Sequence, residues 1–99
     1  MPNPHLIKGF RLAATVLIDN YWIPRQEVEL YLARRQYWSQ RLMTYMSQAG
    51  WQAQLDFEGS QDGLAVLGLD AQGKIQALIH LDPANLTALE AGIAPEELF

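Results

Sequence analysis

Histidine and carboxylate side chains are the first candidates for chemistry in this sequence, because they supply acid–base catalysis and metal ligands. The two histidines, His5 and His80, are far apart in the chain, and neither has a metal-ligand spacing, so we favour surface or capping roles for both. Asp56 and Glu58 alternate on a predicted strand, which places their carboxylates about 7 Å apart on one face. That spacing suits a catalytic carboxylate pair. The alternation of solvent-facing residues along a strand already explains it.

Arg35 is a charged residue that the helical period places near the middle of an apolar arc. One helical turn away lie Tyr31, Leu32, Trp38 and Leu42. A guanidinium in such surroundings is costly to bury unless it is paired. We favour a structural role, with Arg35 stacked on Trp38 or Tyr31 or paired with a C-terminal carboxylate. The alternative is an anion-binding site formed by Arg35 and Trp38.

The common catalytic and nucleotide-binding motifs are missing from the sequence. It contains no G-x-S-x-G, no G-x-G-x-x-G, no Walker P-loop and no H-E-x-x-H. It also contains no cysteine, which excludes disulfides, thiolate zinc sites, iron–sulfur clusters and a cysteine nucleophile. We therefore expect neither a cofactor nor a metal.

Composition and charge narrow the class of protein. With 99 residues, 49% of them hydrophobic and 18% charged, we expect one globular domain over residues 1–99 and a cytoplasmic location. The formal net charge of -4 argues against nucleic acid as a partner. Residues 1–50 carry six basic and three acidic residues, whereas residues 51–99 carry one basic and eight acidic ones. We expect the two halves to attract each other, in the first place within one molecule and alternatively between copies of it.

The first half of the sequence predicts two helices and no membrane span. A helix-start signal and an apolar stripe predict a helix over 4–20, although β-branched residues near its end leave a strand possible there. Pro24 followed by strong helix formers over 25–48 predicts a long helix, which Gly50 ends. The longest apolar stretch in this half, over 12–18, is too short to cross a bilayer.

From Trp51 onward the hydrophobic period changes from 3.6 to 2. This pattern predicts three strands joined by short connections, and hence an antiparallel meander, over 51–58, 64–69 and 74–81. Asp82 and Pro83 then begin a short C-terminal helix over 83–91. The expected fold is therefore a two-layer α+β sandwich with two N-terminal helices, the second long. This order of elements is similar to that of small secretion-chaperone-like and assembly-chaperone domains, although no residue motif carries the similarity.

The predicted sheet has one face that the long helix should cover. That face collects Trp51, Ala53, Leu55, Phe57, Leu64, Val66, Gly68, Ile75, Ala77, Ile79 and Leu81. The pattern sets Leu55 opposite Val66, and Val66 opposite Ala77. The other face has Leu67, Leu69 and Leu78 at its centre, which is typical of a strand covered on both sides. We favour the C-terminal helix as their cover over another subunit or partner.

The long helix is apolar on a second side, where Leu30, Arg34, Tyr37 and Arg41 form a stripe. A solvated face partly covered by the predicted helix 4–20 is the plainest interpretation. Arginine beside tyrosine is also what protein interfaces enrich, which makes an interface the next interpretation. Single-stranded nucleic acid, which also stacks on such residues, comes last because the acidic second half repels phosphates.

These surfaces lead to two hypotheses about function. The first is a non-catalytic protein–protein interaction domain, acting as an assembly factor, chaperone-like adaptor or small subunit of a complex. It would bind a protein partner and form a homodimer. The residues expected to bind are Leu30, Arg34, Tyr37, Arg41, Leu67, Leu69 and Leu78. The second hypothesis is a small enzyme or ligand-binding domain with an anion site at Arg35 and Trp38.

Overall fold

A computed structural model describes residues 14–18, 21–56 and 64–99, which form a mixed α+β fold with a long helix and two small antiparallel sheets. Its elements, in chain order, are β1 (Thr15–Ile18), β2 (Tyr21–Pro24), the 3-10 turn η1 (Arg25–Glu27), α2 (Val28–Gln48), β3 (Gln52–Asp56), β4 (Ala65–Leu69), β5 (Ile75–His80), α3 (Pro83–Glu90) and the 3-10 turn η2 (Pro95–Leu98).

The first correction concerns the predicted helix over 4–20. Residues 15–18 form a strand that pairs antiparallel with β2, with Leu17 opposite Trp22. Stiff β-branched side chains favour the extended backbone, and the pairing lets alternate residues of β1 and β2 pack against the core. The prediction had therefore assigned the wrong hydrophobic period, that of a helix, to residues 15–18. The rest of the predicted helix, up to residue 13, lies outside the described residues.

The long helix α2 is confirmed, including its predicted end. Gly50 adopts a φ of 88°, in the left-handed region that favours glycine. The Trp51 N–H donates to the Met46 carbonyl at 3.1 Å, and the Gly50 N–H donates to the Ser47 carbonyl at 3.0 Å. These two hydrogen bonds are the Schellman pattern, which satisfies the last carbonyl groups of the helix. They also set the direction in which the chain enters β3.

The meander β3-β4-β5 is confirmed, but its second register differs from the prediction. Leu55 lies opposite Val66 as predicted, whereas Val66 lies opposite Ile79 rather than Ala77. A bulge follows Gly68, because Leu69 is paired with Ile75. A one-residue bulge turns the side chains beyond it to the other face. Ile75 is accordingly 51% exposed instead of belonging to the core.

The tight turn between β4 and β5 is held by hydrogen bonds to the Asp70 carboxylate. The Asp70 carboxylate accepts hydrogen bonds from the Gln72 and Lys74 N–H groups, each at 2.9 Å. It also accepts one from Nε2 of Gln76 at 2.8 Å. These bonds hold the pKa of the Asp70 carboxyl below its ordinary value, with the Lys74 bond contributing most. The Asp70 carboxylate thus joins the turn to Gln76, which lies between the paired residues Ile75 and Ala77 where the register shifts.

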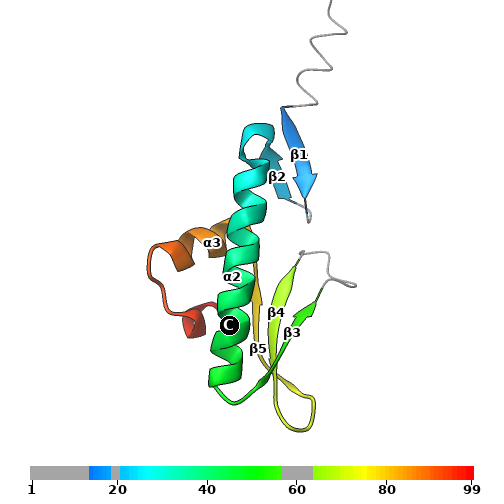
Figure 1. Ribbon diagram of the computed structural model, residues 1–99, viewed down its shortest axis with the longest axis vertical. Helices are drawn as coiled ribbons and strands as arrows, with labels where there is room; N and C mark the ends of the chain where they lie inside the picture. Colours follow the sequence, from blue (N-terminus) through cyan, green and yellow to red (C-terminus); the bar gives the residue numbers. More distant parts are fainter. Residues whose placement is uncertain (1–13, 19–20, 57–63) are drawn as a thin grey trace, which may run out of the picture.

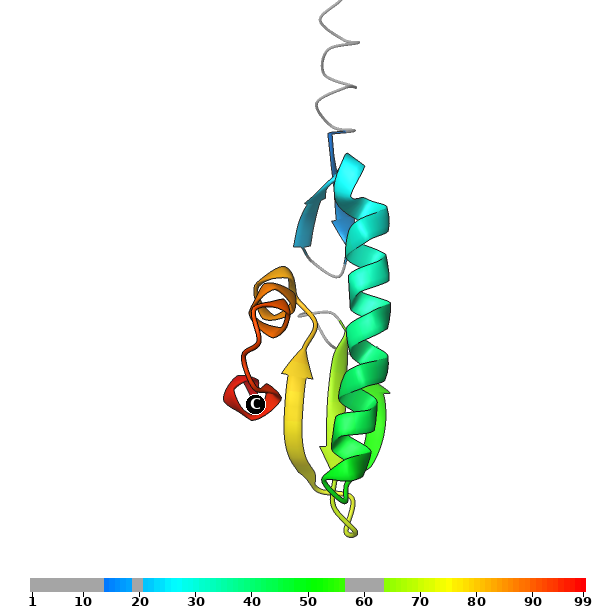
Figure 2. The ribbon, with the colours of Figure 1, turned by 60° about the vertical axis from the view of Figure 1, so that its left-hand side comes forward.

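The helices of the described residues lie on one side of the three-stranded sheet (Figures 1 and 2). The green half of α2 runs along β3 and β4, and the orange and red segment from α3 to η2 lies beside β5. Asp82 caps α3 as predicted, accepting the Asn85 N–H at 2.7 Å. The core joins both helices to the sheet through Ile23, Tyr31, Leu42, Met46, Leu64, Val66, Ala77, Ile79, Leu81, Leu86 and Leu89. Phe57 lies outside the described residues.

The predicted cover of the second sheet face is therefore wrong. Leu86 and Leu89 of α3 pack in the same core as Leu42 and Val66, on the side of the sheet that α2 covers. The reason is that α3 begins right after β5 and its apolar residues meet α2.

Among the described residues, no helix has the length and hydropathy of a membrane span.

Candidate functional site

The predicted stripe on α2 remains largely open to solvent. Leu30 is 59% exposed and Tyr37 is 54% exposed, and Arg41 is exposed as well. These three residues share one side of α2, about 100° around the helix from the buried Tyr31 and Leu42. We call them the Tyr37 stripe. Large side chains that stay this exposed on one side of a helix mark it as a candidate docking surface.

Arg34 also belongs to the predicted stripe, but its guanidinium is paired with a carboxylate of the same molecule. Its Nε lies 2.7 Å from Oε2 of Glu90, and its Nη2 lies 2.8 Å from Oε1 of the same carboxylate. This hydrogen-bonded pair raises the pKa of the Arg34 guanidinium. The contact links α2 to α3 and joins the basic first half to the acidic second half. The Arg34 guanidinium is therefore engaged by Glu90 in this structure.

Arg41 is held by aromatic rings instead of by a carboxylate. Its Cζ lies 5.3 Å from the ring centre of Tyr37 and 5.5 Å from that of Trp38. The two rings meet edge to face, with centres 5.4 Å apart. Among the described residues no carboxylate lies within ion-pair distance of Arg41. Cation–π contacts thus restrict the side chain while its N–H donors remain available.

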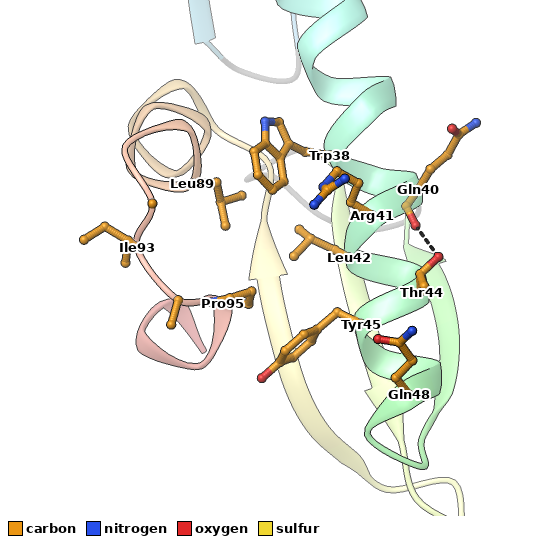
Figure 3. Close-up of a pocket in the computed structure, with 12 residues that line it drawn as sticks. Trp38, Gln40, Arg41, Leu42, Thr44, Tyr45, Gln48, Leu89, Ile93 and Pro95 are labelled. Atoms are coloured by element: carbon orange, nitrogen blue, oxygen red, sulfur yellow. Dashed lines mark hydrogen bonds between the residues drawn. The ribbon is translucent and has the colours of Figure 1, made fainter.

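A groove of about 600 Å³ lies between α2 and the segment that follows α3 (Figure 3). Figure 3 shows Trp38, Arg41 and Tyr45 projecting from α2 toward the side of the groove formed by Leu89 and Pro95. The residues that line it are Trp38, Gln40, Arg41, Leu42, Thr44, Tyr45, Gln48, Leu89, Gly92, Ile93, Ala94 and Pro95. Among these described residues Arg41 alone carries a charge. The lining suits a ligand with an apolar body and an anionic group.

The C-terminal side of the groove is fastened to α2 by contacts of Tyr45 and Phe99. The Tyr45 hydroxyl donates a hydrogen bond to Oε2 of Glu96. The Phe99 ring meets the rings of Tyr45 and Trp51 edge to face, with centres 6.3 and 6.0 Å apart. The Tyr45 bond lowers the pKa of the Glu96 carboxyl and raises the pKa of the Tyr45 hydroxyl. These contacts join η2 and the C-terminal residue to α2.

Replacing Tyr45 by phenylalanine should raise the pKa of Glu96 toward its ordinary value of 4.5, because the Tyr45 hydrogen bond is the main cause of the lowered pKa. In the wild type the folded-state pKa is depressed, so the stabilisation is complete above 4.5 and is lost as the pH falls through the folded-state value. NMR titration of the Glu96 side chain measures both midpoints. Thr44→Val, which alters an exposed neighbour on α2, should keep the wild-type midpoint. Equal midpoints in wild type and Tyr45→Phe would contradict the assignment of this hydrogen bond.

The two residues of the alternative anion site have different surroundings. The Arg35 guanidinium lies 5.9 Å from the ring centre of Tyr31, and burial lowers its pKa. Arg35 does not line the groove, whereas Trp38 does. The stacking on Tyr31 is the structural role that the sequence favoured. Tyr31 is itself fixed, because its hydroxyl donates to the Leu81 carbonyl at 3.1 Å.

The second sheet face presents less apolar surface than the sequence suggested. Leu67 is only 7% exposed, and Leu69 and Leu78 are half-buried. These three residues point away from the face that contacts α2. They carry a weaker case for docking than the Tyr37 stripe does.

The structure adds little support for a functional role of the other candidate residues from the sequence. His5 and Glu58 lie outside the described residues, while His80 and Asp56 are half-buried at strand ends. Where the structure describes the chain, no group of three or more His, Asp or Glu side chains could hold a metal ion.

Sequence reasoning missed two features. Among the described residues, Trp22 is the most exposed large apolar side chain, at 67%. It follows the helix expected over 4–20 and was not singled out, although alternation in β1 and β2 could have revealed it. The groove was missed because its two sides come from segments more than 40 residues apart, such as Trp38 and Leu89.

Comparisons with known proteins found no match of any kind. No protein-family model, no curated protein and no solved structure matched this chain.

Proposed function

We propose that this protein is a non-catalytic protein-binding domain, acting as an assembly factor or adaptor that docks its partner on the Tyr37 stripe. One observation carries the proposal. Leu30 and Tyr37 stay more than half exposed beside Arg41, an arginine with no ion-pair partner among the described residues. Tyrosine and arginine are the residue types that dominate binding energy at protein interfaces.

The Tyr37 stripe suits docking because the Arg41 side chain is already partly ordered in the free protein. Burying a flexible side chain at an interface costs about 0.5–1.5 kcal/mol in lost freedom. The rings of Tyr37 and Trp38 already restrict Arg41, so binding loses less of that freedom. The expected partner is a protein with an apolar surface for Leu30 and Tyr37 and a carboxylate for Arg41, since arginine pairs carboxylates with two parallel hydrogen bonds.

Site-specific photo-cross-linking in native cells tests this proposal. A benzophenone amino acid at position 30 leaves the stacked Tyr37 and Arg41 in place, and the same group at Glu29 is the matched control. Glu29 is also exposed but lies about 100° around α2. We expect a discrete protein adduct from position 30, little from position 29, and loss of the adduct with Arg41→Glu.

Light scattering and the adduct mass then identify whether the partner is a second copy, as in the expected homodimer, or another protein. Thermal unfolding checks that Arg41→Glu still folds. Equal adducts from positions 29 and 30, or none from position 30, would overturn docking on the Tyr37 stripe.

A further inference from the structure

We infer that the groove beside Arg41 binds an extended peptide segment that carries an aspartate or glutamate next to an apolar side chain. This inference rests on the proposed function, since Arg41 belongs both to the Tyr37 stripe and to the lining of the groove. It names the part of the partner that the domain recognises.

The length of the groove fits a short extended segment. Along α2 the lining runs from Trp38 to Gln48, which corresponds to about 15 Å at the rise of an α-helix. Four or five extended residues cover this distance at about 3.3 Å each. The volume of about 600 Å³ accommodates one or two apolar side chains along with their backbone.

The sides of the groove supply the contacts that such a segment needs. Trp38 and Leu89 give an apolar surface at one end, and Tyr45 and Pro95 give another near η2 (Figure 3). The Gln48 side chain is exposed at the far end of the α2 side. Its amide can both donate to and accept from the backbone of an extended peptide.

The positive charge of Arg41 favours an acidic residue in the bound peptide segment. Beside the groove, the Glu90 carboxylate is paired with Arg34, and the Glu96 carboxylate accepts a hydrogen bond from Tyr45. Among the described residues of the lining, Arg41 alone is charged, and no carboxylate lies within ion-pair distance of it. A carboxylate beside it gains a charge-assisted pair, whereas a lysine in the same place is repelled.

Matched peptides test this inference. The probes are fluorescent six-residue peptides with blocked ends, Ala-Leu-Glu-Leu-Ala-Ala and Ala-Phe-Asp-Leu-Ala-Ala, together with twins in which Gln, Asn or Lys replaces the acid. We expect at least one acidic peptide to bind, and its amide twin to bind about tenfold more weakly. NMR shifts should appear at the Trp38 indole and the Leu89 methyl groups.

Variants separate a specific carboxylate contact from general attraction. Arg41→Gln should remove the preference for the acid over the amide, and Arg41→Lys should restore part of it, because lysine keeps the charge but not the paired geometry. Lys74→Gln, an equal change of charge at an exposed turn position, should change nothing.

Several results would overturn this inference. They are equal affinity for acid and amide twins, affinity that does not depend on Arg41, and NMR shifts outside the groove. If 3-phenylpropionate binds as tightly as the peptide, the ligand of the groove is a small carboxylate. If the protein forms dimers through the groove that added peptide does not dissociate, the occupant is a second copy of this chain. If the position-30 adduct persists in those cases, the proposed function stands and only the groove assignment fails.

Discussion

Leu42→Ala should lower the free energy of unfolding by about 3 kcal/mol, because it leaves a cavity at the centre of the core. Leu42 is 1% exposed and packs among residues of both helices and the sheet, including Val66, Ile79 and Leu89. Few atoms can move into the space that the substitution creates. Thermal unfolding should show a melting temperature lower by more than about 10 °C for a domain of this size.

Leu30→Ala is the matched control for this experiment. It makes the same change on the same helix, but Leu30 is exposed on the Tyr37 stripe. We expect a stability within about 0.5 kcal/mol of the wild type. Similar losses for both variants would contradict the orientation of α2, and with it the exposure of the stripe. The position-30 photo-cross-linker depends on the same orientation.

Gly68→Ala should destabilise the protein by about 1–3 kcal/mol through overpacking. The ordinary expectation has the opposite sign, since alanine usually stabilises a strand relative to glycine. A Cβ at position 68 would lie 2.7 Å from Cε3 of Trp51 and 3.0 Å from Sδ of Met46. The methionine sulfur can move aside, but the indole ring is held by the Schellman turn before it and by Phe99.

A double-mutant cycle measures whether Trp51 causes this loss. Gly68→Ala should cost much less in a Trp51→Ala background, where the indole no longer occupies the space, and chemical denaturation of the four proteins gives the coupling energy. A Gly68→Ala protein more stable than the wild type would contradict the close contact between Trp51 and β4.

Local signals explain why much of the fold was predictable. The run of helix formers in α2, the glycine that ends it, and the Asp82–Pro83 start of α3 act over a few residues each. The alternation from Trp51 onward similarly predicted the meander and the pairing of Leu55 with Val66. Such signals are legible in sequence because the groups that interact are neighbours along the chain.

The errors arose where two local signals competed or where a side chain altered a regular pattern. Residues 15–18 carry both a helical stripe and β-branched side chains, and pairing with β2 decided for the strand. The register of β5 shifts beside the turn in which the Asp70 carboxylate binds Gln76, and Ile75 is exposed there. A hydrophobic pattern alone carries no information about such pairings and hydrogen bonds.

For the candidate site, the sequence by itself determined that one side of the long helix presents Leu30, Arg34, Tyr37 and Arg41, because residues three, four and seven apart share a helix face. Only the tertiary structure decided which arginine stays available. Arg34 meets Glu90, 56 residues away, while Arg41 meets two rings of its own helix. The groove likewise exists only because α3 folds back beside α2. Contacts between distant segments depend on how the whole chain packs, which no local period encodes.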